Sequence, residues 1–141
     1  MTIEDIGMDI DIPEVKAELE EEFAAYEAAL VGNDVAALDA FFLDGPTVIR
    51  YGVAENLYGH AEIAAFRAAR SPAGLARSLE RTVISTYGHD LGVAATLFRR
   101  DGAPGKVGRQ MQTWIRIAGR WRIVAAHVSL VYDPDQPASR G

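Results

Sequence analysis

Two amide side chains beside a tryptophan give the segment at residues 107–117 the means to bind a small polar molecule. The segment has the pattern of a strand, which places Gln110, Gln112 and Trp114 on one face. Buried amide groups need hydrogen-bonding partners. Two hypotheses follow: the glutamines form the polar floor of a pocket, or they lie in an interface between subunits. Because both faces carry apolar residues, we expect helices on one side and a second subunit on the other.

The next strand-like segment, residues 120–132, ends its apolar run in a histidine and a serine. Alternation places His127 and Ser129 on the same face as Trp121 and Ile123. His127 is either a core histidine with satisfied hydrogen bonds or a catalytic base, because imidazole titrates near neutral pH. Ser129 lies outside any G-x-S-x-G or S-x-x-K pattern, so no serine-hydrolase triad is predicted. Both residues remain candidates for contact with a substrate.

An arginine lies between apolar neighbours in the string "VIRYG". Alternation places Arg50 on the face of Val48, and a buried guanidinium needs an anion because an unpaired buried charge is costly. Its fork of N–H donors fits a carboxylate or a carbamate. Tyr26 lies on the apolar face of a predicted helix, where it is either a core residue or a hydrogen-bond donor to a developing oxyanion.

Two further arginines lie on the helix predicted at "HAEIAAFRAAR". Arg67 and Arg70 follow the apolar Ile63 and Phe66 by four residues each. For Arg67 two interpretations stay open. Its side chain lies either at the solvent-exposed edge of the helix or where it reaches a pocket. Arg70 is expected at the solvent-exposed edge.

The composition excludes several classes of protein. Hydrophobic residues make up 49% of the 141 and charged residues 24%, which is typical of one globular domain. The net charge of -6 argues against nucleic acid or an anionic membrane as a partner. No apolar run approaches the roughly 20 residues of a membrane span. The N-terminal residues are acidic, unlike a signal peptide, so we expect a cytoplasmic protein.

Metals and other cofactors are not expected either. The sequence has no cysteine, which excludes disulfides and thiolate zinc sites. His60, His89 and His127 lack the spacing of metal ligands, and no glycine-rich nucleotide-binding string is present.

The predicted elements are two helices, a short hairpin, a third helix and a long antiparallel meander. Asp11 can cap the first helix and Pro13 suits its first turn. The buried face of that helix is predicted to contain Val15, Leu19, Phe23, Tyr26 and Leu30. The meander strands are predicted at 79–87, 90–99, 107–117 and 120–132. We divide the chain into an N-terminal arm (1–12), one α+β domain (13–132) and a flexible tail (133–141).

Four strings resemble the AtzH/HpxZ-like family, within the nuclear transport factor 2-like superfamily that is also called SnoaL-like or ketosteroid isomerase-like. They are "FAAYEAAL", "IRYGVAENLYGHAEIAAFRAAR", "TYGHDLGVA" and "RQMQTWIR…GRWRIVAAHVS", and the likeness covers about residues 13–132. The resemblance implies a cone-shaped α+β roll. In this roll three helices from the N-terminal half pack on a strongly curved, mostly antiparallel sheet, and a homodimer forms through the sheet.

The resemblance also implies an activity. Members of the family are encoded with catabolic amidases that act on cyanuric acid products or oxalurate, and AtzH-like proteins are associated with a decarboxylating amidohydrolase step from 1,3-dicarboxyurea to allophanate. The family's proposed active residues match Tyr26 and Arg50. We therefore expect a cofactor-free hydrolase for a small anionic substrate. The candidates for substrate binding are Arg67, Gln110, Gln112, Trp114, His127 and Ser129.

Two alternatives stay open. The first is a non-catalytic partner of a pathway amidase, which would show an exposed apolar sheet face without an enclosed cavity. The second is an isomerase or dehydratase of the ketosteroid type, which needs a carboxylate in its pocket as the base. The sequence offers Asp39, Glu55, Glu80 and Asp90 for that role.

Overall fold

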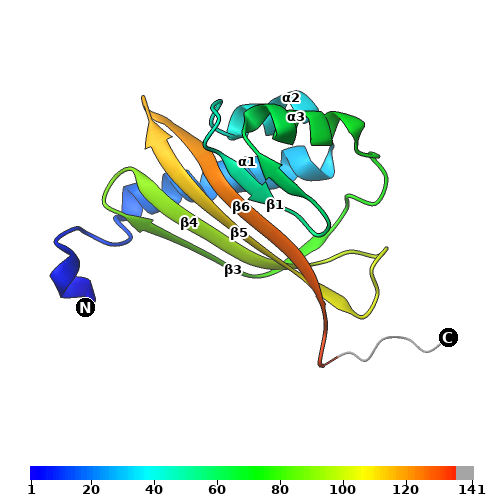
Figure 1. Ribbon diagram of the computed structural model, residues 1–141. Helices are drawn as coiled ribbons and strands as arrows, with labels where there is room; N and C mark the ends of the chain where they lie inside the picture. Colours follow the sequence, from blue (N-terminus) through cyan, green and yellow to red (C-terminus); the bar gives the residue numbers. More distant parts are fainter. Residues whose placement is uncertain (136–141) are drawn as a thin grey trace.

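The computed structural model describes residues 1–135, and within this range one six-stranded sheet is covered on one face by three α-helices (Figure 1). The helices are α1 (Pro13–Val31), α2 (Val35–Phe41) and α3 (His60–Ala69). The strands are β1 (Ile49–Tyr51), β2 (Asn56–Tyr58), β3 (Ser78–Tyr87), β4 (Leu91–Arg99), β5 (Lys106–Ile117) and β6 (Arg120–Tyr132). The structure thus confirms the predicted α+β architecture.

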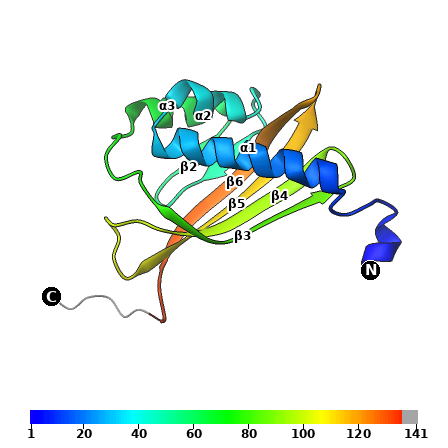
Figure 2. The same ribbon diagram turned by 180° about the vertical axis from the view of Figure 1, so that it is seen from behind.

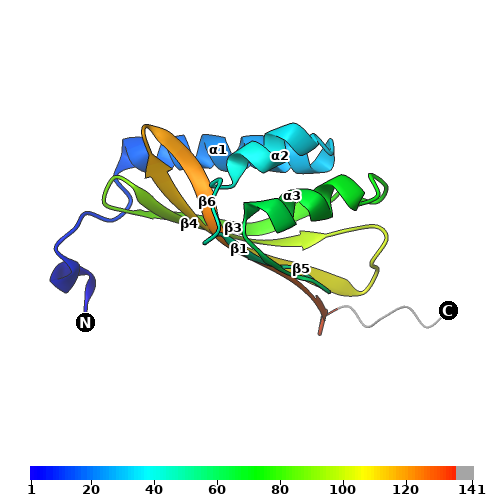
Figure 3. The same cartoon turned by 45° about the horizontal axis from the view of Figure 1, so that its top comes forward.

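The sheet has the order β2-β1-β6-β5-β4-β3. All neighbouring strands run antiparallel except β1 and β6, which are parallel. From behind, α1 crosses the sheet along its length (Figure 2), and the tilted view shows all three helices on the same side (Figure 3). The long strands begin and end within one residue of their predicted ranges.

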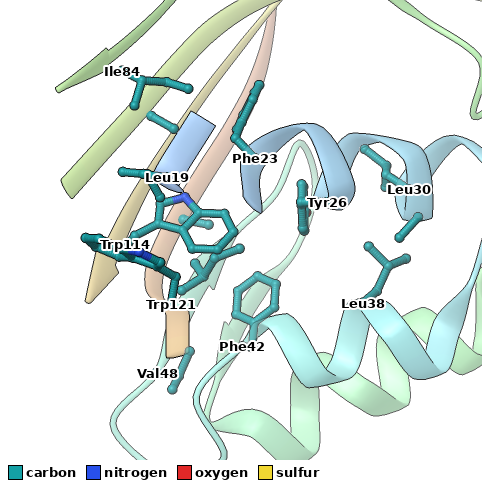
Figure 4. Packing of buried hydrophobic residues seen from close by; sticks show 14 of the residues in the cluster. Leu19, Phe23, Tyr26, Leu30, Leu38, Phe42, Val48, Ile84, Trp114 and Trp121 are labelled. Carbon is teal, nitrogen blue, oxygen red and sulfur yellow. The ribbon is translucent and has the colours of Figure 1, made fainter. Parts of the chain in front are cut away.

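The helix α1 supplies much of the core. The predicted face of α1 is buried, and its residues pack against Trp114 and Trp121 from the sheet (Figure 4). Each large apolar side chain buried in this way contributes about 1.5–3 kcal/mol. Pro13 occupies the first turn as predicted, but Asp11 does not cap the helix. Its carboxylate instead accepts a hydrogen bond from the Thr86 backbone N–H at 2.8 Å, which ties the chain before α1 to β3.

A β-bulge in β6 overturns part of the predicted alternation. Thr113 pairs with Ala125 and Trp114 with Ile123, so β6 has one extra residue there, Val124. An extra residue moves the following side chains to the opposite face of the sheet. The inward positions of β6 are therefore odd-numbered before the bulge and even-numbered after it.

His127 and Ser129 consequently lie on the outer face of the sheet, which contradicts the prediction that they share a face with Trp121 and Ile123. The His127 ring packs edge-on against Tyr51 with 6.2 Å between centroids, and Ser129 accepts a hydrogen bond from Arg109 Nε at 3.2 Å. Neither residue reaches the helix-covered side of the sheet.

The two ends of the described range contact β3 and β4. Ile10 in the N-terminal arm forms an isolated antiparallel bridge with Tyr87, and Asp133 pairs with Arg99 at 2.6 Å. The predicted flexible tail begins at residue 133, and its residues 136–141 lie outside the described range. No helix between residues 1 and 135 is long and apolar enough to cross a membrane.

Candidate functional site

A cavity of about 210 Å³ lies between the helices and the helix-covered face of the sheet. Its wall takes side chains from α1, the β1–β2 hairpin, α3, the segment after α3, and strands β4 to β6. The charged side chains that line it are Arg50, Glu55, Arg70, Arg77 and Arg100. Sites for drug-sized ligands hold about 300–1,000 Å³, so this cavity suits a smaller molecule.

Tyr26 projects from α1 into this wall. Its side chain is 3% exposed, and its ring makes edge-on contacts with Phe41 and Trp114 at centroid distances of 5.7 and 6.3 Å. These contacts fix the ring, and the hydroxyl lies within 3.1 Å of Arg67 Nη2 on α3. The sequence offered Tyr26 as a core residue or as a donor, and the structure gives it both a packed ring and a polar tip.

The hydrogen bond between Tyr26 and Arg67 has only one possible direction. A guanidinium donates and never accepts, so the phenolic oxygen accepts from Arg67. The Tyr26 O–H proton is then directed elsewhere, and no protein acceptor for it occurs within residues 1–135. Tyr26 is among the residues that line the cavity, and no other group in the described part of the chain engages its O–H proton.

Arg67 lies beneath the cavity wall and is only 1% exposed. Its guanidinium is stacked near the rings of Tyr26 and Phe42, at 5.9 and 5.3 Å from their centroids. Its Nε and Nη1 atoms have no hydrogen-bond partner in the described part of the chain, and no carboxylate there pairs with it. The burial of Arg67 excludes the solvent-exposed helix edge, and its link to the cavity is the hydrogen bond to Tyr26, because Arg67 itself is not among the lining residues.

Arg50 faces the cavity from β1, on the inward face that it shares with Val48 as predicted. It is 8% exposed, and its Nη1 donates to Glu55 Oε1 at 2.9 Å. The second Glu55 oxygen accepts from the Ala54 backbone N–H at 3.1 Å. The Glu55 carboxylate lies where a Cβ atom at Gly52 would be, so a larger residue there would displace the Glu55 side chain from Arg50.

Arg77 and Gln110 form a second polar group in the wall. Arg77 Nε donates to Glu27 at 3.0 Å, its Nη2 donates to Gln110 Oε1 at 2.9 Å, and its guanidinium lies 4.4 Å from the Phe98 ring centroid. Gln110 is therefore part of the cavity, which decides between the two hypotheses for this glutamine. The second glutamine, Gln112, has a different role.

Gln112 and Trp114 belong to the buried core. They are 1% and 0% exposed, and Trp114 Nε1 donates to Gln112 Oε1 at 3.0 Å. The amide oxygen of Gln112 is thus satisfied within β5. The two residues support the cavity from below, and the predicted shared face of Gln110, Gln112 and Trp114 is confirmed.

Three cavity residues lacked a usable signal in the sequence. Arg70, predicted on the solvent-exposed edge of α3, lines the cavity instead, as do Arg77 and Arg100. Arg77 follows a segment without periodicity, and Arg100 follows the last residue of β4. Only the spacing of three between Arg67 and Arg70, which places them on neighbouring helix positions, could have linked Arg70 to the site.

The electrostatics of the site favour an anion. Burial chiefly, and then the neighbouring charges of Arg67 and Arg50, lower the pKa of Arg70 below its usual range. Arg50 and Arg77 pair with Glu55 and Glu27, whereas Arg67, Arg70 and Arg100 have no carboxylate partner among residues 1–135. Arg67 is buried, and Arg70 and Arg100 are half-buried. An excess of positive charge in such surroundings is costly unless a ligand balances it. Within the same range no cluster of acidic and histidine residues could hold a metal ion.

The AtzH-like family model matches residues 8–134 of the chain. A crystal structure of a protein of unknown function from Pectobacterium atrosepticum is 55% identical, and the match covers 89% of this chain and 99% of that chain with a TM-score of 0.86. A cystatin-like fold protein from Burkholderia xenovorans is 44% identical, with 91% and 100% of the two chains covered and a TM-score of 0.87.

A more distant structure shares the fold. A nuclear transport factor 2-like superfamily protein from Salmonella enterica is 23% identical, with coverage of 91% and 94% and a TM-score of 0.65. The predicted fold is therefore confirmed. No curated protein matches the chain.

Proposed function

The chain belongs to the AtzH-like family, and from that premise we propose that it is a small cofactor-free enzyme of amide and ureide catabolism. It breaks a C–N bond in a compact carboxylated substrate of the 1,3-dicarboxyurea or oxalurate type. The observation that carries the proposal is the Tyr26 hydroxyl, which accepts from Arg67 and is thereby free to donate its proton into an arginine-lined cavity.

The proposed step is proton transfer to the leaving nitrogen. In an N-carboxylated urea, the electron pair of the breaking C–N bond stays with nitrogen, which takes the proton from Tyr26, and the carboxylate carbon leaves as carbon dioxide. The Arg67 guanidinium stabilises the phenolate that remains until solvent returns a proton. A positioned general acid accelerates such a step by about 10²–10⁴.

Arg50 has the second role in this proposal. Its Nη1 is occupied by Glu55, and its other N–H groups can bind a carboxylate or carbonyl oxygen of the substrate. An amide substrate such as oxalurate needs water as well. Since His127 lies on the outer face of the sheet, a carboxylate of the substrate itself remains to activate that water.

The two alternatives have weaker support. A ketosteroid-type isomerase needs a free carboxylate base, but both oxygens of Glu55 already accept hydrogen bonds. Glu80 and Asp90 are paired with Arg99 and Arg116 in positions away from the cavity wall. Asp39 has an oxygen without a hydrogen-bond partner in the described range, but it does not line the cavity either. A purely non-catalytic partner needs no arginine-lined cavity, so the enzymatic proposal accounts for more of the molecule.

The experiment follows turnover directly. Purified protein is incubated with 1,3-dicarboxyurea, oxalurate or allophanate, and carbon dioxide and products are measured for the wild type, Tyr26→Phe and Arg50→Ala. The proposal expects turnover of at least one of these substrates and its loss in both variants. Activity that survives both substitutions rejects the assignment, and no turnover of any substrate favours the role of an amidase partner.

A further inference from the structure

We propose that Arg70 forms a binding position for a second carboxylate, so that the cavity selects a dianion over the monoanion that lacks one of its carboxylates. This inference rests on the proposed function in that it concerns the same cavity. The inference names Arg70 as the residue that distinguishes a doubly charged substrate from its singly charged product. Arg50 and Tyr26 alone would bind either one.

The side chain of Arg70 lines the cavity but is poorly satisfied by the protein. It lies directly after α3, at the helix C-cap. Its Nε atom is buried and has no partner in the described range, and its Nη2 has one contact, to Asn33 Oδ1, at 3.5 Å. A contact of that length is at the limit of a hydrogen bond. The terminal Nη1 and Nη2 groups, which have no closer partner among residues 1–135, are therefore the part of the fork that a ligand could use.

Among the arginines that line the cavity, Arg70 has no carboxylate partner in residues 1–135 and is repelled by neighbouring positive charges. The charges of Arg67 and Arg50 act on it, and the nearest carboxylate of the site, Glu55, is already engaged by Arg50. Arg77 is likewise engaged by Glu27 and Gln110. A ligand carboxylate at Arg70 would relieve the repulsion between like charges and complete the hydrogen bonds of the fork.

The size of the cavity restricts the ligand that could use both positions. A volume of about 210 Å³ corresponds to roughly seven water molecules at about 30 Å³ each. That space suits a short chain with an acid group at each end. The same space gives a monoanion no partner for the second group, so Arg70 would stay without an anion when the product of decarboxylation is bound.

The test compares two stable probes that differ by one carboxylate. Glutarate has the five-atom backbone of a dicarboxylated urea, and butyrate is glutarate without one carboxylate. Dissociation constants of both are measured by calorimetry for the wild type, Arg70→Gln, Arg70→Lys and the control Arg120→Gln, whose side chain is exposed in the β5–β6 hairpin.

We expect the wild type to bind glutarate about 10- to 100-fold more tightly than butyrate, because one additional charge-assisted hydrogen-bonded pair contributes a factor of this size to affinity. Arg70→Gln should lose most of that preference by weakening glutarate alone, Arg70→Lys should keep part of it, and Arg120→Gln should keep all of it. Circular dichroism verifies the fold of each variant. An unchanged preference in Arg70→Gln, or a wild type that binds the two probes equally or binds neither, overturns the inference.

The binding test does not depend on catalysis. If Arg70 sets the preference for glutarate but no ureide is turned over, the binding position stands and the proposed function fails. If a ureide is turned over but Arg70→Gln still prefers glutarate, the proposed function stands and the binding position fails.

Discussion

Arg67 Nη2 donates a hydrogen bond of 3.1 Å to the phenolic oxygen of Tyr26, although the two residues are 41 positions apart in the sequence. One comes from α3 and the other from α1, so their contact depends on how the helices pack over the sheet. The contact fixes the direction in which Tyr26 can donate its proton. The buried Arg67 guanidinium thus orients a phenol group instead of pairing with a carboxylate.

Replacement of Arg67 by methionine tests this relationship. Methionine fills similar space without charge, and removal of a buried charge that lacks a carboxylate partner costs little or stabilises the fold by about 1 kcal/mol. Turnover should fall about 10-fold or more, with KM changed far less, because the Tyr26 hydroxyl loses the donor that orients it. Steady-state kinetics and thermal unfolding measure the two effects. Normal turnover in Arg67→Met contradicts a positioning role.

Gly52→Ala tests the turn that returns Glu55 to Arg50. The added methyl group would collide with the Glu55 carboxylate, so the ion pair must separate. We expect reduced turnover and a loss of at most about 1 kcal/mol of unfolding free energy, because the end of the flexible Glu55 side chain can move aside. Gly45→Ala is the matched control, because a Cβ atom there meets nothing within 4 Å. Turnover of Gly52→Ala equal to that of Gly45→Ala contradicts this account of the turn.

Much of the fold could be predicted because its signals are local. The buried face of α1 and the ends of the four long strands follow from side-chain periodicity, which the backbone geometry imposes on each element separately. The inward direction of Arg50, Gln110 and Trp114 follows from the same alternation. Tyr26 and Arg50 entered as site candidates through family resemblance, and both line the cavity.

The remaining features depend on relationships between elements. The bulge at Val124 exists only in the pairing of β6 with β5, and it is the reason that His127 and Ser129 face outward. Arg70 lines the cavity because the sheet curves beneath the end of α3, and no local pattern encodes that curvature. Glu55 reaches Arg50 through a tight turn at Gly52. The sequence indicates the turn but not the contact between Glu55 and Arg50.

We propose that the outer face of the sheet forms the homodimer interface. Cross-strand partners place several exposed apolar side chains on this face, including Ile49, Val83, Leu91 and Met111, with Met111 57% exposed. Met111→Asp should shift the protein from dimer to monomer, because an unpaired charge in an apolar interface is costly. Light scattering after size exclusion measures the mass. Val31→Asp, at the exposed end of α1, is the control that should remain dimeric.

Turnover by Tyr26→Phe tests the central claim most directly. This substitution removes one hydroxyl and leaves Arg67 without its hydrogen-bond partner, so we expect a loss of about 1–3 kcal/mol in unfolding free energy. Assays are therefore run well below the unfolding temperature. With 1,3-dicarboxyurea as substrate, kcat should fall by a factor of about 10²–10⁴. The affinity for glutarate should change less than about threefold, because the arginines that hold the anion remain. A Tyr26→Phe protein that binds glutarate and turns over substrate at the wild-type rate contradicts the account.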